Sequence, residues 1–149
     1  ADRDRVYTVG HGSAASLALR AGAELEQVKA IVAFNPITDI DGRISAFRRE
    51  LRQIDRRAIV ILRESSPLEH LLMLRTKPVF LFHSVADEAV PVAESARLAL
   101  ALKPGVDTSR VMIVPTGGHR PAMLEQGIPA ALSWLDDLAD PQPASHAAR

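Results

Sequence analysis

The chain contains no cysteine among its 149 residues, and aromatic residues make up only 4% of it. The absence of cysteine excludes a disulfide framework, thiol catalysis and a zinc site with cysteine ligands. With so few aromatic side chains, the core is expected to consist of alanine, leucine, valine and isoleucine. Since 47% of the residues are hydrophobic and the length suits one domain, a single globular domain is expected.

The chain also lacks an excess of charge of either sign and any long apolar segment. Eighteen basic residues balance 18 acidic ones. Nucleic acids and anionic membranes attract a basic surface, so neither is expected as a partner. No apolar run approaches the ~18 residues of a membrane span. The N-terminus, Ala-Asp-Arg-Asp-Arg, is neither a signal peptide nor an initiator sequence, which is compatible with a processed or truncated start. A cytoplasmic location is favoured.

Short apolar runs rich in β-branched residues alternate with helical patterns along the chain. The four runs are Val6–Val9, Ala30–Phe34, Val79–Phe82 and Val111–Val114. The helical patterns are Ser13–Ala21, ended by Gly22, then Ala93–Leu102, ended by Lys103-Pro104-Gly105, and Ile128–Leu138. Continuous apolar strands between helices are typical of a parallel sheet that helices cover on both faces. The expected fold class is therefore α/β, with a mostly parallel sheet whose four strands pair in sequence order.

Two segments give less regular patterns. Between residues 40 and 77, apolar residues recur at helical spacing among arginines, and two interleaved acids favour a solvated helix face over a phosphate-binding patch. The apolar positions are Ile44, Phe47, Leu51 and Ile54. Ala58–Leu62 fits a strand or a buried helical turn, because periodicity cannot decide over five residues. The tail, residues 141–149, is rich in proline and alanine and is expected to be disordered.

A glycine turn, Gly-His-Gly-Ser-Ala-Ala, follows the first predicted strand at residues 10–15. One chemistry that uses such a turn is dinucleotide binding. Gly10, Gly12 and Ala15 match the spacing G-x-G-x-x-[G/A], in which the glycines let a pyrophosphate approach a helix N-terminus. That function also requires an acid near the end of the next strand, for the ribose hydroxyls. The next strand ends at Asn35 and is followed by an acid only a few residues later, so this alternative is the weaker one.

The second chemistry is the nucleophile elbow of hydrolases, a strained strand-to-helix turn of the form small-x-nucleophile-x-small. Gly10 and Ala14 fill the two small positions, which places Gly12 at the nucleophile position. Shifting the frame by one residue makes Ser13 the nucleophile but puts His11 at a small position, where it fits poorly. A plain strand–helix turn without a catalytic role is the third explanation of this segment.

An acid and a histidine follow the third and fourth predicted strands. Asp87 comes after Val79–Phe82, in a loop that leads into a helix, and His119 comes after Val111–Val114 and a pair of glycines. The carboxyl ends of parallel strands meet at the edge where open α/β sheets bind ligands. An acid at that edge can orient an imidazole, and the chain order turn, Asp, His is that of the hydrolase triad.

Together these segments resemble the C-terminal half of an α/β-hydrolase, most of all the catalytic domain of the prolyl oligopeptidase family. Dienelactone hydrolases and related esterases are close seconds. The matching segments are Gly10–Ala14, Ser66-Pro67, Phe82–Asp87 with Val90-Pro91, and Gly117–His119. The separations of 75 residues between Gly12 and Asp87 and 32 between Asp87 and His119 are also of the expected kind. The resemblance covers about residues 5–138 and predicts a partial α/β-hydrolase domain over residues 1–140.

The resemblance implies a role for each site residue. Asp87 would orient His119, and His119 would be the general base that deprotonates a nucleophile. The backbone N–H of Ser13 would be one oxyanion donor. His83 is a structural residue in this motif, and a metal site of His83, Asp87 and His119 is not favoured because no ligand spacing supports it. No cofactor and no metal are expected, and the implied substrate is a small-molecule ester or peptide.

The resemblance also indicates what this chain would lack. Gly12 has no side chain to attack a carbonyl, and the early strands of the fold, with the loop that gives the second oxyanion donor, do not precede the elbow strand. We therefore expect an impaired hydrolase with weak or no activity on p-nitrophenyl esters. A non-catalytic binding module of the same fold and a dinucleotide-binding domain are the alternatives. Since Val6–Val9 would form an unprotected edge, we expect a homo-oligomer or a partner that supplies the missing strands.

Overall fold

The structure, a computed structural model, describes residues 5–46, 55–103 and 105–140. Its sheet has four parallel strands in the order β1-β2-β3-β4. The strands are β1 (Tyr7–His11), β2 (Ala30–Phe34), β3 (Val79–Ser84) and β4 (Arg110–Val114). The predicted α/β class, the four strands and their parallel sequence order are confirmed.

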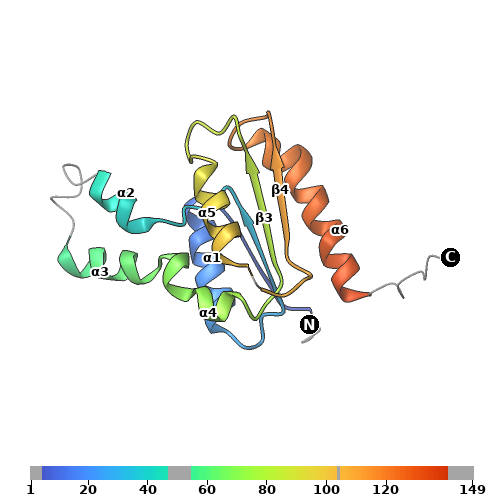
Figure 1. The fold of residues 1–149 in the computed structure, drawn as a ribbon, viewed down its shortest axis with the longest axis horizontal. Helices are drawn as coiled ribbons and strands as arrows, with labels where there is room; N and C mark the ends of the chain where they lie inside the picture. The colour runs from blue at the N-terminus through green and yellow to red at the C-terminus, as the bar shows by residue number, and fades with distance from the viewer. Residues whose placement is uncertain (1–4, 47–54, 104, 141–149) are drawn as a thin grey trace.

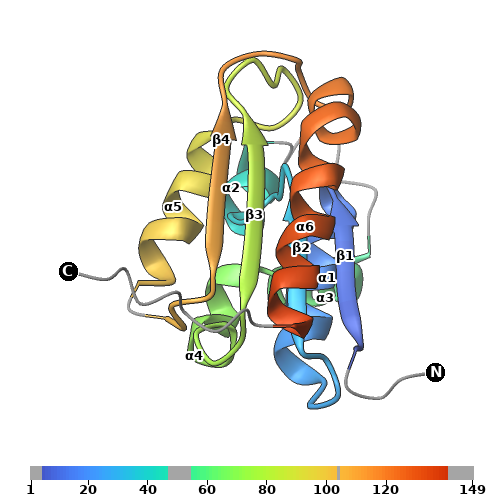
Figure 2. The same ribbon diagram turned by 90° about the vertical axis from the view of Figure 1, so that its right-hand side faces the viewer.

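Helices cover both faces of this sheet (Figure 1 and Figure 2). One face carries α1 (Ser13–Glu24), α4 (Leu71–Leu74) and α5 (Ala93–Ala101), and the other carries α6 (Ile128–Ala139). The shorter elements are α2 (Ile40–Ala46), α3 (Arg56–Glu64), the 3-10 helix η2 (Pro67–His70) and the π-helical turn η3 (Met123–Gly127). None of the described helices is long and apolar enough to cross a membrane.

The two faces of the sheet have cores of different composition. Under α1, α4 and α5 the buried side chains are aliphatic and include Leu19, Ile31, Leu74, Leu81 and Leu98. Under α6 the core contains Phe34, Phe80, Phe82, Met123 and Trp134. The rings of Phe34 and Phe80 both contact further aromatic rings. The expectation of a wholly aliphatic core is therefore wrong for the α6 face, because the few aromatic residues are concentrated there.

Helix α1 corrects one sequence prediction. Gly22 was expected to end this helix, but α1 continues through it to Glu24. A Cβ on Gly22 would lie 2.4 Å from Cγ1 of Ile31 on β2. The glycine therefore permits close packing of the helix on the sheet rather than ending the helix.

The segment between β2 and β3 corrects another. Ala58–Leu62 lies inside α3, with Asp55 accepting a hydrogen bond from the N–H of Arg57 at the helix start. Ile61 is 59% exposed, so the segment is neither a strand nor a buried turn. Most of the predicted arginine-rich helix face, and the tail at residues 141–149, lie outside the described residues.

Candidate active site

Three loops meet at the carboxyl edge of the sheet: the turn after β1 and the loops after β3 and β4 (Figure 1 and Figure 2). The loop after β3 carries Asp87, and the loop after β4 carries His119. The Nδ1–H of His119 donates to Oδ2 of Asp87 at 2.6 Å. The structure thus brings together the two residues singled out in the sequence, 32 positions apart, and their catalytic roles stay predictions.

Asp87 is held in one orientation by hydrogen bonds from four described residues. Its side chain is fully buried. Oδ1 accepts from the N–H groups of Ala89 (2.8 Å) and Val90 (2.9 Å), and Oδ2 accepts from His119 and from Nδ2 of Asn35 (2.5 Å). Burial alone would raise the pKa of Asp87, but these hydrogen bonds, above all that from His119, outweigh burial and lower the pKa to about 2. Asp87 is therefore a carboxylate at neutral pH.

Sequence reasoning missed Asn35 as a site residue. Asn35 is fully buried directly after β2 and has a φ of 48°, a left-handed conformation that asparagine adopts more readily than most residues. The signal was a polar residue at the carboxyl end of a strand whose five residues are all buried. In the sequence, Asn35 was considered only because a dinucleotide-binding site would have an acidic residue near that position.

The turn between β1 and α1 is tightly packed and strongly bent. A Cβ on Gly10 would lie 2.2 Å from the carbonyl oxygen of Ala14, so only glycine fits where α1 crosses β1. Gly12 has a φ of 60° and a ψ of −123°, in a region that L side chains rarely adopt. A Cβ on Gly12 would lie 3.4 Å from Nε2 of His119. A side chain at residue 12 would therefore face the imidazole nitrogen that Asp87 does not bind.

Ser13 occupies a different position from Gly12. It is the exposed first residue of α1, and no hydrogen bond joins its hydroxyl to His119 within the described part of the chain. Its N–H lies in the first turn of the helix, where backbone donors have no acceptor within the helix itself. This placement is more compatible with the prediction that the N–H of Ser13 is an oxyanion donor than with the alternative frame in which Ser13 is the nucleophile.

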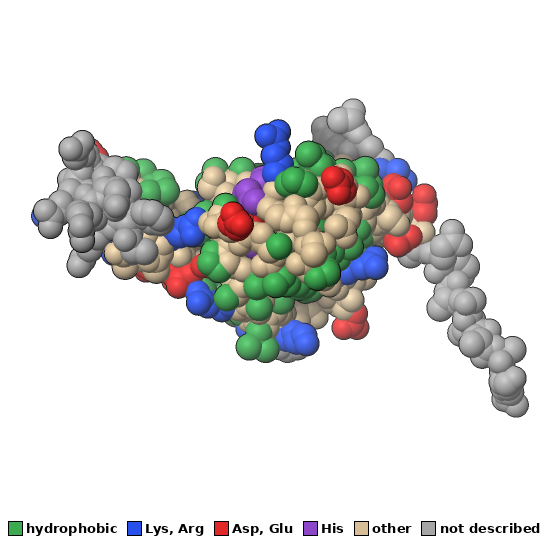
Figure 3. Space-filling view, turned by 90° about the horizontal axis from the view of Figure 1, so that it is seen from above, with side chains coloured by type: hydrophobic (Ala, Val, Ile, Leu, Met, Phe, Trp, Pro, Cys, Tyr) green, Lys and Arg blue, Asp and Glu red, His purple; other side chains and the backbone are tan. Residues whose placement is uncertain are grey.

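A second histidine, His11, lies against His119. The ring centroids are 4.2 Å apart, and Nε2 of His11 lies 3.2 Å from the carbonyl oxygen of His119, to which it can donate. Burial lowers the pKa of His11, which favours a neutral ring beside the imidazole of His119. The side chain of His119 is 29% exposed, and Figure 3 shows a histidine side chain reaching the surface at this end of the sheet. Sequence reasoning had considered His11 only as an occupant of the turn.

His83 lies beside this site without reaching the surface. It is fully buried, with Nδ1 2.7 Å from Oγ of Ser95 and Nε2 2.9 Å from the carbonyl oxygen of Val90. These contacts join β3 to α5 and to the loop of Asp87. Among the described residues, no group of three or more histidine and acidic side chains is arranged to hold a metal ion.

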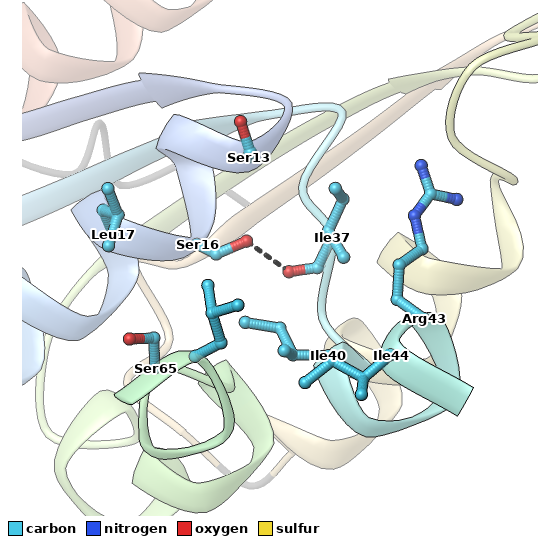
Figure 4. A pocket seen from close by; sticks show the side chains of 9 residues that line it. Ser13, Ser16, Leu17, Ile37, Ile40, Arg43, Ile44 and Ser65 are labelled. Carbon is cyan, nitrogen blue, oxygen red and sulfur yellow. Dashed lines mark hydrogen bonds between the residues drawn. The ribbon is translucent and has the colours of Figure 1, made fainter. Parts of the chain in front are cut away.

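An apolar pocket of about 310 Å³ adjoins Ser13 (Figure 4). Its aliphatic side chains are Leu17, Ile37, Ile40, Ile44 and Leu62. Hydrogen bonds fix the wall after β2, because Oγ of Ser16 donates to the carbonyl oxygen of Ile37 at 2.5 Å and the N–H of Thr38 donates to Glu94 on α5. The pocket is therefore an apolar surface next to the turn, and hydrogen bonds hold one of its walls in place.

The parallel sheet with helices on both faces belongs to the α/β class, and solved structures of the α/β-hydrolase fold match the chain. A puromycin-hydrolysing peptidase from Mycobacterium tuberculosis has a TM-score of 0.72 at 23% identity, over 92% of this chain and 23% of its own. The Pyrococcus horikoshii acylaminoacyl peptidase has a TM-score of 0.65 at 21% identity, over 83% and 21%. A Pyrococcus furiosus esterase has a TM-score of 0.61 at 18% identity, over 91% and 51%.

The family follows from the sequence itself. The profile of the prolyl oligopeptidase family matches residues 1–140, so the chain belongs to that family as a prolyl oligopeptidase-like hydrolase domain. The predicted resemblance is confirmed. A comparison with curated proteins gives no significant match. The chain spans about a fifth of the length of the two peptidases and about half of the esterase.

Proposed function

We propose that this chain carries the acid–base part of a serine-hydrolase site, in which Asp87 orients His119 and His119 exchanges protons with the reacting groups. One observation carries the proposal: a Cβ at residue 12 would lie 3.4 Å from Nε2 of His119. A serine hydroxyl at residue 12 would be within hydrogen-bond reach of that nitrogen. The contact between Asp87 and His119 supports the same assignment, since the acid fixes the tautomer and direction of the imidazole.

Glycine at residue 12 means that the site has no hydroxyl to form an acyl-enzyme. Triad residues act as a unit, so the loss of the nucleophile removes most of the rate that the acid and the base could otherwise provide. We therefore propose an impaired hydrolase domain rather than a serine enzyme of full activity.

The substrate class in this proposal is a small-molecule ester or a peptide with an aliphatic group. The apolar pocket beside Ser13 supports it, because an aliphatic group held there would place its carbonyl near the turn. The N–H of Ser13 would donate to the developing oxyanion. The similar structures include a peptidase and an esterase, so they are compatible with a peptide bond or an ester bond as the bond that is hydrolysed.

The test is to supply the missing hydroxyl with Gly12→Ser. We expect this variant to react with a fluorophosphonate probe at residue 12 and to hydrolyse p-nitrophenyl butyrate faster than the wild type. The gain should stay about 10²–10³-fold short of a complete site, because the described site groups include only one oxyanion donor. Peptide mass spectrometry locates the adduct, and the double variant Gly12→Ser/His119→Gln should remove both label and rate.

The wild-type chain is the matched control, because it already carries a serine one position further along. A label on Ser13 in the wild type would show that the shifted frame is right. Gly12→Ser without any label would contradict the proposal and favour a binding module of the same fold. A titration with a nicotinamide dinucleotide tests the remaining alternative.

A further inference from the structure

The backbone at Gly12 leaves room beside the base. Around the position that a Cβ would occupy, the nearest atoms from beyond the adjoining residues are Nε2 of His119 at 3.4 Å and its Cε1 at 3.7 Å, and no other atom of the described residues comes within 4 Å. A hydrogen bond to a ring nitrogen spans roughly 2.7–3.2 Å. A water oxygen close to that position would therefore be within bonding distance of His119.

The hydrogen bonds around Asp87 leave His119 ready to accept a proton there. Nδ1 of His119 faces a buried carboxylate and must carry the proton that it donates. In the neutral ring the lone pair is then on Nε2, which is the atom that faces Gly12. Backbone N–H groups and Asn35 hold Asp87 in place, and Asp87 in turn fixes the direction of the His119 ring.

Resting on the proposed function, we propose that His119 activates a water molecule beside Gly12, so that the chain hydrolyses its ester or peptide directly, without an acyl-enzyme. Nε2 of His119 takes one proton from water while the water oxygen bonds to the carbonyl carbon, giving a tetrahedral intermediate. The imidazolium then returns that proton to the leaving alkoxide or amine as the carbon–heteroatom bond breaks. The products are the free acid and an alcohol or amine, and no oxidation or reduction occurs.

The position of the base suits this reaction. The His119 side chain is 29% exposed, so a carbonyl compound can approach the imidazole from solvent. The exposed Ser13 begins α1 directly after Gly12, and its N–H is the oxyanion donor of the proposed function. General-base catalysis contributes typically about 10²–10⁴-fold, so the expected rate is slow but measurable above buffer.

The test compares p-nitrophenyl butyrate hydrolysis by the whole chain and three variants. We expect His119→Gln to lower the rate above buffer by at least about 100-fold. Gly12→Ala should lower it toward the same level, because its methyl group takes the room that water needs. His70→Gln, which removes one imidazole from η2 outside the site, should keep the wild-type rate. The wild type should show no pre-steady-state burst of p-nitrophenol and no fluorophosphonate adduct.

The outcomes separate this proposal from the one on which it rests. If Gly12→Ser is labelled but the wild-type rate is absent or unchanged by His119→Gln, water activation is wrong and the proposed function stands. If Gly12→Ser is not labelled, the proposed function itself fails. A burst or a covalent adduct in the wild type overturns direct attack by water. Circular dichroism of each variant checks that it is folded, and His119→Gln decides the matter if Gly12→Ala does not fold.

Discussion

The carboxylate of Asp87 is buried and yet held ionised, which ties the stability of the fold to pH. Burial favours the neutral acid, whereas the hydrogen bonds from His119 and from the backbone favour the anion. Because the donors prevail, the folded protein binds a proton at Asp87 less tightly than the unfolded chain does. The contribution of Asp87 to stability is therefore complete above pH 3.8 and disappears as the pH falls through about 2.

We predict that Asp87→Asn removes this pH-dependent contribution, which amounts to about 2 kcal/mol. The measurement is the free energy of unfolding in urea between pH 5 and pH 2. The wild type should lose the increment across this range, whereas the variant has already lost it at pH 5. Asp137→Asn, at an exposed position on α6, is the matched control. Equal losses in the wild type and in Asp87→Asn would contradict the prediction.

At this scale the sequence indicated that Asp87, His119 and Gly12 would lie together, as they do, but it did not indicate Asn35. The first three stand at positions that a chain-order pattern marks, next to glycines or directly after an apolar strand. Asn35 acts through a hydrogen bond to a residue 52 positions away. No local pattern encodes such a contact, so only the folded geometry assigns it.

At the scale of elements, His83 joins strand β3 to helix α5 and to the loop that carries Asp87. Burial lowers the pKa of His83, although the hydrogen bond to Val90 and the charge of Asp87 oppose the effect. The unfolded chain therefore takes up this proton first as the pH falls below about 6.5, and the folded state becomes less stable.

We predict that the melting temperature of the wild type falls more steeply between pH 6.5 and pH 5 than that of His83→Gln. The variant has no imidazole at this junction and so lacks the linked proton. Differential scanning calorimetry across this range gives the slopes. His70→Gln is the control for losing a histidine elsewhere, and its slope should follow the wild type. A His83→Gln slope as steep as the wild type would show that His83 is not the linked group.

Local patterns predicted the strands better than the ends of the helices. Each strand overlaps a short run rich in apolar residues, and that run is visible without knowledge of its neighbours. The end of α1 was predicted wrongly because a glycine near the end of a helical pattern resembles a stop signal. Gly22 instead allows the helix to pack closely on Ile31. Ala58–Leu62 was ambiguous because a five-residue window cannot separate the helical period from the strand period.

At the scale of the whole molecule, β1 forms one edge of the described sheet. Val9 is 59% exposed there, and an apolar groove of about 270 Å³ runs between β1 and α6. Leu132 and Leu135 of α6 contribute to the groove. An edge with free backbone groups next to an apolar groove favours pairing with another chain. We propose that this side of the chain binds a second copy or a partner that adds strands to the sheet.

We predict that the chain associates at micromolar concentration and that Val9→Lys weakens the association, because a charge on an edge strand opposes pairing. Light scattering or sedimentation equilibrium gives the mass. Val111→Lys places the same charge on β4 at the opposite edge, where Val111 is 47% exposed, and should leave the mass unchanged. A wild-type monomer that unfolds cooperatively would overturn the proposal.

Gly12 has a further consequence, for the energetic margin of the fold. A residue with a side chain pays about 1–3 kcal/mol to hold such a backbone conformation. A serine at this turn would lower the stability of the fold by that amount but would supply a reactive hydroxyl. An alanine would lower the stability equally and supply no hydroxyl. Glycine avoids the loss of stability and also lacks the hydroxyl. In a protein whose total stability is only about 5–15 kcal/mol, glycine at this position therefore makes the fold more robust than a serine or an alanine would.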